Sequence, residues 1–501
     1  PKMKTVRCLL AFVPLAIGAS HLGEGASLVQ VVSEARAEQR TKDPTPQYYW
    51  PHARGHVGHY STANYSGPAN LSTSLAWSWH HPEGRFHTTV VSAALIDDKQ
   101  NLYVATEDGI RKFSRAGETL WHYQPPGSVP TCPSLMDGAL YGNTGNGYVY
   151  AVDMETGKQR WLKHTDVNAG GDTAYVEAHD GVVVTGLQSG PGGGNKHLYG
   201  LNATSGEQLW MYKADVSLWN VMAVFPGDDS LIVMDLHGGV YKHALHNGTL
   251  LWRTKAPSVS LASFSDGGVM LGPDGTSYTC SNYAGNGQED MKGALRAYRL
   301  SDGHLLWDKT LDRPCNSWPV VSSDNSLVVV PSGSFVASPI SMDFKAMVAA
   351  RKGPEKLHDL SLSLAGKERE FFKRPEVTAE LLAFDVATGA LRWSYKFPPY
   401  GRIAAAGDEE GVLQRNELRI RNQCLPAQFG SPTLSSDGTV YVGRADGKLW
   451  AVGDKDGNGA IDPEKEVASF DTQAGFLHPG ASFAPGMMAM TSCDGVFVWN
   501  V

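Results

Sequence analysis

The sequence predicts an all-β fold made of repeated four-stranded units that close into a ring. A hairpin motif recurs along most of the chain, and most of its copies follow one another at steps near forty residues. Such steps are what four short strands per unit require. Glycine is abundant, with 55 residues in a chain of 501, which suits a protein with many turns. These observations favour one large closed domain over several separate ones.

The repeated motif is clearest between Val149 and Trp161 (VYAVDMETGKQRW). It consists of a short alternating strand, a Thr-Gly turn and a second strand that ends in Trp. The Gly supplies the positive φ that a tight hairpin needs. Two long steps, before Trp307 and before Trp393, call for insertions. The closing tryptophans of all copies are Trp79, Trp121, Trp161, Trp210, Trp252, Trp307 and Trp393.

The two ends of the chain are predicted to share one unit. The last stretch (FAPGMM, AMTSCDG, VFVWNV) supplies only three strands, and LAWSW, which ends at Trp79, supplies the missing fourth. A ring closed in this way hides its own sheet edges. Counted so, the units form an eight-bladed β-propeller, with seven blades as the alternative.

Three segments are expected along the chain. Residues 1–37 form a signal or leader segment, 38–70 an extended arm rich in Pro, Tyr and His, and 71–501 the propeller. Insertions interrupt the propeller at about 336–380 and 400–425, and the charged first insertion is expected to form short surface helices.

The N-terminus has the plan of a secretory signal peptide. Basic residues precede the apolar run from Cys8 to Ala19, which is too short for a membrane span. A buried N-terminal helix is the alternative, and cleavage after Ala19, Ala26 or Ala37 stays open. We therefore expect an exported, secreted protein. Four glycosylation sequons agree with export: Asn64, Asn70, Asn202 and Asn247.

Charge and cysteine content narrow the function classes. The net charge of −8, without a long basic run, argues against a nucleic-acid surface. Beyond the leader an odd number of cysteines remains, so at least one is unpaired if the others bridge. A bridge between Cys315 and Cys424 is one plausible pairing, because each precedes the first strand of neighbouring units. The five are Cys132, Cys280, Cys315, Cys424 and Cys493.

The hairpin A-x-D-x-x-T-G-x-x-x-W, complete at Ala151–Trp161 and Ala383–Trp393, resembles the tryptophan-docking repeat of the quinoprotein-like β-propellers. The resemblance covers nearly all of residues 71–501. It implies the propeller fold but not one chemistry, since the family includes dehydrogenases that use pyrroloquinoline quinone (PQQ) and also non-catalytic propellers. The repeated Trp is expected to pack between adjacent blades.

A ligand site in a propeller would be built from the starts of the innermost strands and the loops that enter them. Trp219 and Trp318 lie outside the hairpin repeat, so either could stack on a flat cofactor. The alternative is that both plug the channel or pack beside it. The cofactor-binding candidates are Trp219, Asn220, Asn316, Trp318, Gln428 and His478; further channel candidates are His87, Thr131 and Asp172.

The sequence departs from the dehydrogenases that it resembles. Those similar to methanol dehydrogenase place two adjacent cysteines at the quinone, and this chain has no Cys-Cys pair. It also has no C-x-x-C-H haem motif. Catalytic residues cannot be assigned from the sequence, and PQQ lacks the support that a vicinal cysteine pair would give.

A metal signal lies between the third and fourth strands of one predicted unit. Oxygen-bearing side chains alternate there, and Gly459 stands at the sharp turn, as in the calcium loop of EF-hands. The twelfth position is Lys465, where a bidentate Glu is expected; Glu464 or Glu466 would have to substitute. An ordinary Asp/Gly turn is the alternative. The predicted calcium ligands are Asp454, Asp456, Asn458 and Asp462.

Two functions follow from these observations. The first is a non-catalytic scaffold that binds a protein or small-molecule ligand at the channel mouth. The second is a PQQ-dependent alcohol or sugar dehydrogenase with a divergent site. No transmembrane segment and no nucleic-acid partner are expected.

Overall fold

The computed structural model describes residues 47–501 except 57, 59, 171–172, 191–193, 256–267, 284–291, 316, 335–377, 401–404, 421–423, 425–427 and 478–479. The chain divides into two units, Pro1–Thr45 and Pro46–Val501, and the described residues belong to the second. Among them, α4 (Asp408–Glu417) is the α-helix, and all other regular elements are strands. No helix in this described part is both apolar and long enough to span a membrane.

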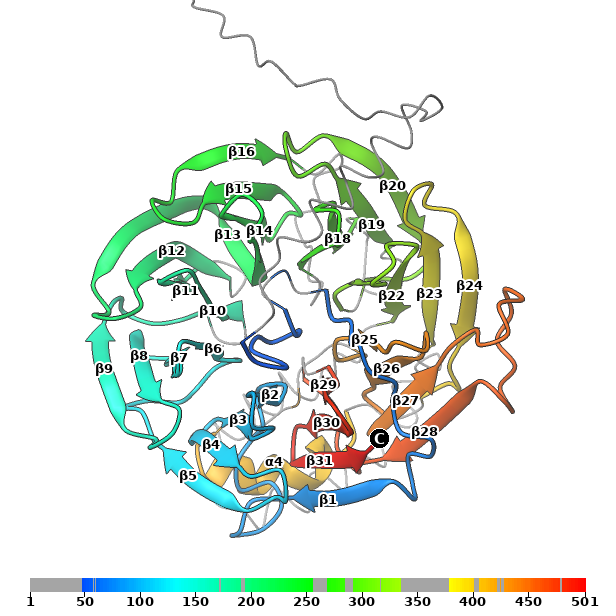
Figure 1. Ribbon diagram of the computed structural model, residues 1–501, viewed down its shortest axis with the longest axis horizontal. Coiled ribbons are helices and arrows are strands. Elements are labelled where there is room, and N and C mark those ends of the chain that lie inside the picture. Colours follow the sequence, from blue (N-terminus) through cyan, green and yellow to red (C-terminus); the bar gives the residue numbers. More distant parts are fainter. Residues whose placement is uncertain are drawn as a thin grey trace, which may run out of the picture. The chain divides into compact units, whose positions relative to one another are not determined.

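The strands form antiparallel sheets arranged around a common centre (Figure 1). In the four-stranded sheets built from four consecutive strands, the first strand lies nearest the centre and the last lies on the rim (Figure 1). The first two four-stranded sheets are β2 (Leu95–Ile96), β3 (Leu102–Thr106), β4 (Gly109–Phe113), β5 (Thr119–Tyr123), and β6 (Ser134–Met136), β7 (Ala139–Asn143), β8 (Tyr148–Asp153), β9 (Gln159–His164). Three further sheets are β17 (Val269–Leu271), β18 (Ser277–Asn282), β19 (Gly293–Tyr298), β20 (Leu305–Leu311); β21 (Val320–Val321), β22 (Leu327–Gly333), β23 (Ala379–Asp385), β24 (Leu391–Lys396); and β25 (Thr433–Leu434), β26 (Val440–Gly443), β27 (Lys448–Val452), β28 (Val467–Asp471).

One sheet has seven strands because β13 (Gln208–Phe225) serves two sets of neighbours. Its first part pairs with β12 on the rim, and its second part pairs with β14 near the centre. If the sheet is divided within β13, the four-stranded sets number eight; the blade count itself stays a prediction. The remaining strands of this sheet are β10 (Val176–His179), β11 (Val182–Ser189), β12 (Asn195–Asn202), β14 (Ser230–Asp235), β15 (Val240–Ala244) and β16 (Leu250–Thr254).

The ring closes as the sequence predicts. β1 (Leu75–Trp79) is the outermost strand of a sheet whose other members come from the end of the chain: β29 (Ser482–Ala484), β30 (Met487–Ser492) and β31 (Gly495–Asn500). β1 pairs antiparallel with β31, so that Leu75 faces Trp499 and Trp79 faces Val496. This pairing covers the rim side of the last strand of the chain and confirms the predicted closure.

The repeated tryptophans join neighbouring sheets. The indole Nε1–H of Trp161 donates to the carbonyl oxygen of Ala203 over 2.8 Å, and Ala203 belongs to the hairpin turn of the following set of strands. Trp210 makes the same bond to Leu245, Trp252 to Leu300 and Trp307 to Val386. A buried indole N–H requires an acceptor. The backbone of the next hairpin supplies one, which confirms packing between adjacent sheets at these positions; in the closing strand Trp77, not the predicted Trp79, makes this bond, to Arg115.

The Gly of each Thr-Gly or equivalent turn is required for two reasons. Gly206 has a φ of 71°, and an added Cβ would lie 2.6 Å from the Trp161 ring. Gly248 stands in the same relation to Trp210, with φ at 68° and a distance of 2.6 Å. The ring of one set of strands therefore lies directly on the turn of the next, and a side chain there would force the two apart.

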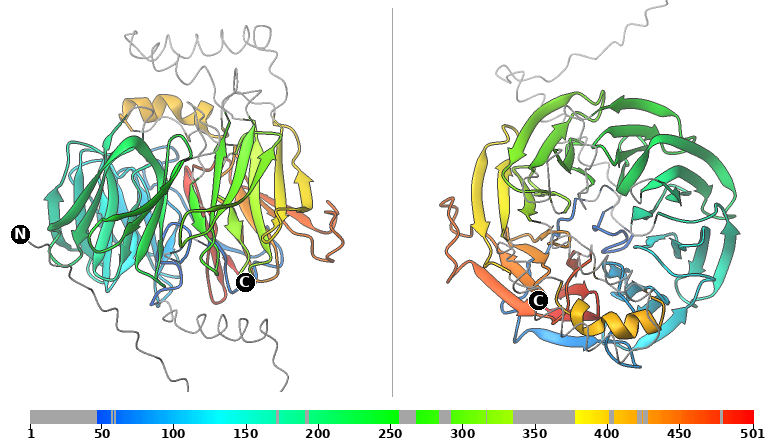
Figure 2. Two further views of the ribbon diagram at one scale, coloured as in Figure 1. Left: turned by 90° about the horizontal axis from the view of Figure 1, so that it is seen from above. Right: turned by 180° about the vertical axis from the view of Figure 1, so that it is seen from behind.

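The insertions are described only in part. The first, expected at about 336–380, lies almost entirely outside the described residues, so its predicted helices have no structural counterpart here. In the second, expected at about 400–425, α4 lies near the entry side of the inner strands. Figure 2 shows α4 and the dark blue residues that follow position 47 on opposite faces of the ring. The predicted boundaries at residues 37 and 70 stay predictions.

Replacing Gly206 by Ala should test the docking. We expect Gly206→Ala to lower the free energy of unfolding by about 2–4 kcal/mol, because a left-handed φ and a steric clash with Trp161 both act. Gly181→Ala is the matched control, since Gly181 has a φ of 74° but nothing within 4 Å of an added Cβ. It should lose only about 1–2 kcal/mol. Urea unfolding measures both, and equal losses would contradict the docking role.

Candidate functional site

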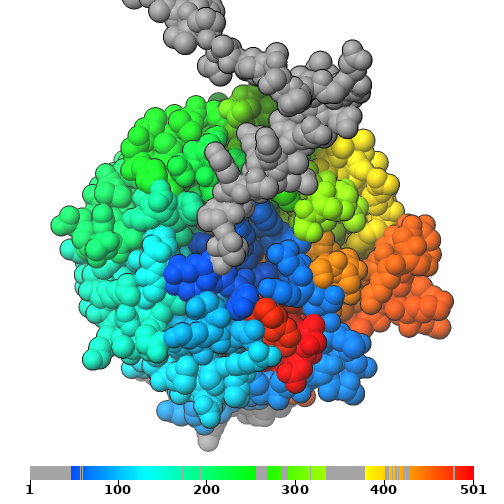
Figure 3. All heavy atoms as spheres, in the orientation of Figure 1, coloured from blue at the N-terminus to red at the C-terminus, as the bar shows by residue number. Residues whose placement is uncertain are grey.

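The described residues between 47 and 66, which belong to the predicted arm, run across the centre of the ring (Figure 1). The N–H and C=O of Trp50 both bond to Ile96, at the end of the innermost strand β2. Further along, the carbonyl of Gly58 accepts from Leu271, and that of Ser61 accepts from Leu434. These contacts reach the carboxyl ends of inner strands from well-separated sheets. The blue arm residues fill the middle of this face of the molecule (Figure 3).

Arg54 extends from the arm into the channel. Its guanidinium carbon lies 3.5 Å from the ring centroid of Trp318 and 5.3 Å from that of Tyr175. Its Nε donates to Ser431 Oγ over 2.9 Å. Arg54 is 1% exposed and Trp318 is fully buried. A cation held over an indole face away from water is strongly attracted to it, so Arg54 ties the arm to three different inner strands or their entry loops.

A second polar contact of the arm involves His52. Its Nδ1 lies 2.8 Å from Glu177 Oε2 and 2.9 Å from Ser134 Oγ, and all three residues are buried. Burial lowers the pKa of His52 to about 3, so the ring is neutral near pH 7. In the tautomer protonated on Nδ1 it can donate to the carboxylate. Glu177 lies on β10, and its buried carboxyl group is therefore met by the arm rather than left in an apolar environment.

The structure brings part of the predicted cofactor set to the channel. Trp318 is buried there under Arg54, and Trp219 and Asn220 lie in the inner half of β13, at 8% and 3% exposure. Gln428 is buried between strands: its amide donates to the carbonyl of Ser334, and its oxygen accepts from Arg444. Asn316 and His478 lie outside the described residues.

The remaining channel candidates are not gathered at one point. Thr131 Oγ1 donates to the Ala174 carbonyl over 3.0 Å, which is a structural bond between neighbouring sheets. His87 pairs with Glu83 at 2.9 Å and stacks on His81, away from Arg54 in the segment after β1. Asp172 lies outside the described residues.

The described channel residues do not fit a quinone stacked on Trp318. Arg54 covers one face of the indole, and the whole side chain is inaccessible. Trp219 is also largely buried and packs in a cluster with Tyr60 of the arm. With the arm in this position neither tryptophan offers an open ring face, which agrees with the alternative that both pack in or beside the channel.

Sequence reasoning missed Arg54 and His52. The arm carries no repeat period, and its composition indicates only an irregular segment. Nothing in the local sequence marks an Arg that packs on residues more than one hundred positions away. The one weak indication of the arm's position is Glu177. A carboxylate inside a short apolar strand needs a buried polar partner.

The predicted calcium loop connects β27 and β28, as expected. Asp454 and Asp456 each accept backbone N–H bonds within the loop. Together with Glu466 they place carboxylate oxygens within 4.8 Å of one another. Asp462 does not belong to this group, since it pairs with Lys465 at 2.7 Å. Asn458 directs its Oδ1 to the Ala460 N–H. The structure thus favours Glu466 as the substitute acidic residue.

The Glu466 carboxylate already holds the loop together. It accepts from the Lys455 N–H over 2.7 Å and from the Asp462 N–H over 2.8 Å. These backbone hydrogen bonds, the one from Asp462 first, lower the pKa of Glu466. The carboxylate is therefore ionised near pH 7, as a metal ligand must be.

The predicted Cys315–Cys424 bridge is wrong. Cys315 is bonded to Cys280, and Cys424 is bonded to Cys493, each with a Cα–Cα distance of 5.8 Å. Two cysteines that start neighbouring units along the chain need not have their Cβ atoms close together. Strand pairing decides this, and it places Cys280 on β18 beside the segment that holds Cys315. Cys132 is free and buried, and burial raises the pKa of its thiol.

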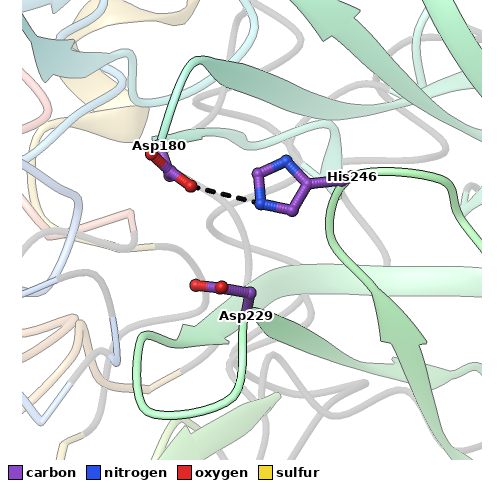
Figure 4. Close-up of side chains that lie close together, drawn as sticks. All are labelled: Asp180, Asp229 and His246. Carbon is purple, nitrogen blue, oxygen red and sulfur yellow. Dashed lines mark ion pairs between the residues drawn. The ribbon is translucent and has the colours of Figure 1, made fainter.

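A further carboxylate and imidazole group lies on turns of the seven-stranded sheet (Figure 4). Asp180, Asp229 and His246 bring ligand atoms within 4.8 Å of one another, and His246 Nε2 lies 3.2 Å from Asp180 Oδ2. All three are exposed. Exposed groups of this kind are common without an ion, and we assign this one no role.

The fold and the docking contacts define the class of protein. Antiparallel sheets arranged around a channel, with rim tryptophans such as Trp161 lying on the turn of the next sheet, make this a β-propeller of the quinoprotein-like type. The family described as outer membrane protein assembly factor BamB matches residues 106–258 and 236–409. Because the two matches span more than half of the chain, the protein belongs to this PQQ-repeat propeller family.

Solved structures support the fold. BamB from Moraxella catarrhalis is 13% identical, with a TM-score of 0.54 over 85% of this chain and 99% of that one. The quinohemoprotein alcohol dehydrogenase from Comamonas testosteroni is 13% identical, with a TM-score of 0.61 over 93% and 84%. That of Pseudomonas putida HK5 is 13% identical, with a TM-score of 0.56 over 93% and 81%. A search of curated protein sequences found no significant match.

Removing the Arg54 side chain should loosen the arm. Arg54→Ala deletes the contact with Trp318 and the bond to Ser431, and we expect the arm to lose about 2 kcal/mol of docking free energy. Hydrogen exchange of residues 47–66, followed by mass spectrometry, should show faster exchange in the variant. Lys99→Ala, which removes a lysine with a side chain 63% exposed, is the control and should leave the arm unchanged. Unaltered exchange in Arg54→Ala would contradict the anchoring role.

Proposed function

We propose that this protein is a non-catalytic binding scaffold of an exported compartment, which recognises a protein or a small-molecule ligand at the mouth of its channel. The observation that carries this proposal is the position of Arg54. Its buried guanidinium lies against Trp318, one of the two tryptophans on which a flat cofactor could stack. An arm that occupies the channel is suited to hold the ring together. A partner or ligand would then be recognised at the entry side of the channel.

The description of the matched family supports a scaffold, since it names an assembly factor of the outer membrane. Two disulfides support an oxidising, exported compartment. Of the four sequons, Asn64, Asn70 and Asn247 are exposed, which would let them accept a glycan. Export, cleavage of a leader and glycosylation remain parts of this proposal.

The second candidate is a PQQ-dependent alcohol or sugar dehydrogenase. It is favoured by the likeness to quinohemoprotein alcohol dehydrogenases, which extends over most of both chains. Against it stand the missing cysteine pair and the buried tryptophans. The two functions differ in one measurable property, which is uptake of the quinone.

Titration of the purified full chain with PQQ and Ca²⁺ distinguishes the two functions. For a scaffold we expect no quinone absorbance retained after gel filtration and no dye reduction with alcohols or sugars. The dehydrogenase from Comamonas testosteroni serves as the positive control for both assays. Stoichiometric PQQ uptake by the wild-type chain, with substrate-dependent dye reduction, would overturn the scaffold and establish the enzyme.

We also propose that the 454–466 loop binds one Ca²⁺ and that the ion stiffens a peripheral hairpin. Asp454, Asp456 and Glu466 would supply oxygen ligands, with Asn458 and Asp462 of the predicted set as further candidates. Carboxylate oxygens in a glycine-containing loop are the donors that Ca²⁺ prefers. The ion would have a structural role, since the loop lies on a turn between β27 and β28.

Calcium titration by isothermal calorimetry tests this site. We expect Asp456→Asn to weaken binding at least about tenfold, because a charged ligand is lost. Asp274→Asn removes a carboxylate from a turn in another sheet and should not alter binding. Absence of any calcium-dependent heat in the wild-type protein, or equal affinity in both variants, would show that the loop is an ordinary Asp/Gly turn.

A further inference from the structure

Residues 80–89, which we call the linker, connect the closing strand β1 to the first sheet. The linker makes several contacts with Asp494, which lies in the turn between β30 and β31. The Phe86 N–H donates to Asp494 Oδ1 over 2.6 Å, and Arg85 and His80 both contact the same carboxylate. Asp494 is 3% exposed. The linker thus passes over the point where the two ends of the propeller meet.

The linker also contributes two histidines to a cluster of three imidazoles. His81 stacks on His87, with ring centroids 4.4 Å apart and planes 10° apart. His81 Nε2 and His122 Nε2, which comes from β5, each lie 3.8 Å from the same oxygen of Asp108. Two of the three histidines therefore lie near one carboxylate group, and the third stacks on one of them.

The Asp108 carboxylate is already engaged by stronger donors. Arg111 pairs with it at 2.6 Å, and Thr88 of the linker donates to it. Glu83 pairs with His87 but has a side chain 69% exposed. Protonation of His81 and His122 would therefore add positive charge beside Arg111, which already pairs with the Asp108 carboxylate, a group with a side chain 30% exposed. Both imidazoles and the Arg111 guanidinium reach the same oxygen of Asp108, so their positive charges would lie close enough together to repel.

The linker also holds a strained residue. Phe86 has a φ of 65°, a left-handed conformation that is costly for a bulky side chain. Its ring packs on the first turn of α4, where Gly411 leaves room for it, and Arg415 lies 5.1 Å above it. Loosening the linker would release this conformation. It would also remove a support of α4, which is held to the last sheet by Cys424–Cys493.

We propose that the linker is a pH-sensitive clasp: acid loosens it by charging His81 and His122 beside Arg111, and this frees the α4 side of the channel entry. His80 acts in the opposite direction, since its charge strengthens the contact with Asp494. The clasp controls the order of the entry side and does not depend on whether the propeller is a scaffold or an enzyme.

The direction of the pH dependence follows from the surroundings of each histidine. Burial, followed by the nearby Arg111, lowers the pKa of His81 and of His122. An open linker would let both return toward about 6.5. In the open state His81 and His122 therefore bind protons at a higher pH than in the closed state. Closure weakens as the pH falls through about 6.5. The hydrogen bond to Asp494 raises the pKa of His80, so His80 stabilises closure at low pH and loses this effect as the pH rises.

Of the acids near the linker, Asp108 and Asp494 titrate below this range, and Asp408, at the start of α4, titrates within it and is unchanged in the histidine variants. Burial alone would raise the pKa of Asp108, but hydrogen bonds from Arg111 and Thr88 outweigh it and hold the pKa well below its usual range. For Asp494, the bonds from His80 and Arg85 likewise outweigh burial and lower the pKa. Burial raises the pKa of Asp408 to about 6, against the effect of Arg415, but this pair lies within the α4 segment.

Hydrogen exchange of the linker at pH 7.5 and 5.5, corrected for the intrinsic rate, tests the clasp in the full chain. Wild-type protein should show a several-fold increase in linker opening at the lower pH. The double variant His81→Gln/His122→Gln should abolish that increase. His80→Gln should enlarge it, because the opposing charge is lost. Residues 139–153 of the second sheet are the internal control and should not respond.

Opposite effects of the two variants separate the clasp from general acid destabilisation. Linker opening that is independent of pH in the wild type would overturn the proposal, as would a double variant that responds like the wild type. If the double variant fails to fold, modification of single histidines by diethyl pyrocarbonate in the wild type decides the question. His81 and His122 must then become protonated at lower pH than His80, and any other order overturns the proposal.

Discussion

The contact on which the whole ring depends is the indole of one sheet lying against the glycine turn of the next. Rim tryptophans such as Trp161 and Trp210 donate to a backbone carbonyl of the following hairpin, and their rings occupy the space that a Cβ would need. Sheets in a ring have no continuous backbone pairing between them, so such side-chain contacts must set their spacing. Burying each indole is worth about 2–3 kcal/mol. Repeated around the ring, this contact makes neighbouring sheets stabilise one another.

The centre of the ring is organised on a different principle. The inner strands present polar groups such as Ser134, Glu177 and Ser431 toward the axis, and the arm meets them with His52 and Arg54. Polar groups removed from water need partners. The arm supplies these partners to strands of several sheets at once, which makes it a part of the fold although it has no repeat of its own. It also determines which residues a ligand could reach.

The entry side of the inner strands is where structural and functional demands meet. The linker, α4 and the Cys424–Cys493 bridge all converge near the joint between the two chain ends. A ring that is closed by non-covalent pairing is most easily opened at its joint. Ionisable groups are concentrated there, and Phe86 is held in a costly conformation. A propeller can in this way respond to its surroundings without any change in its repeated sheets.

The sequence by itself determined the all-β class, the hairpin units, the tryptophan docking and the closure of the last sheet by LAWSW, because these rest on short periods and local turn chemistry. Only the tertiary structure decided what fills the channel, how Cys280, Cys315, Cys424 and Cys493 pair, and that Glu466 rather than Asp462 joins Asp454 and Asp456. The physical reason is distance along the chain. Arg54 meets Trp318 and Ser431 through the curvature of the ring, and no local pattern of residues encodes a contact that the ring itself creates.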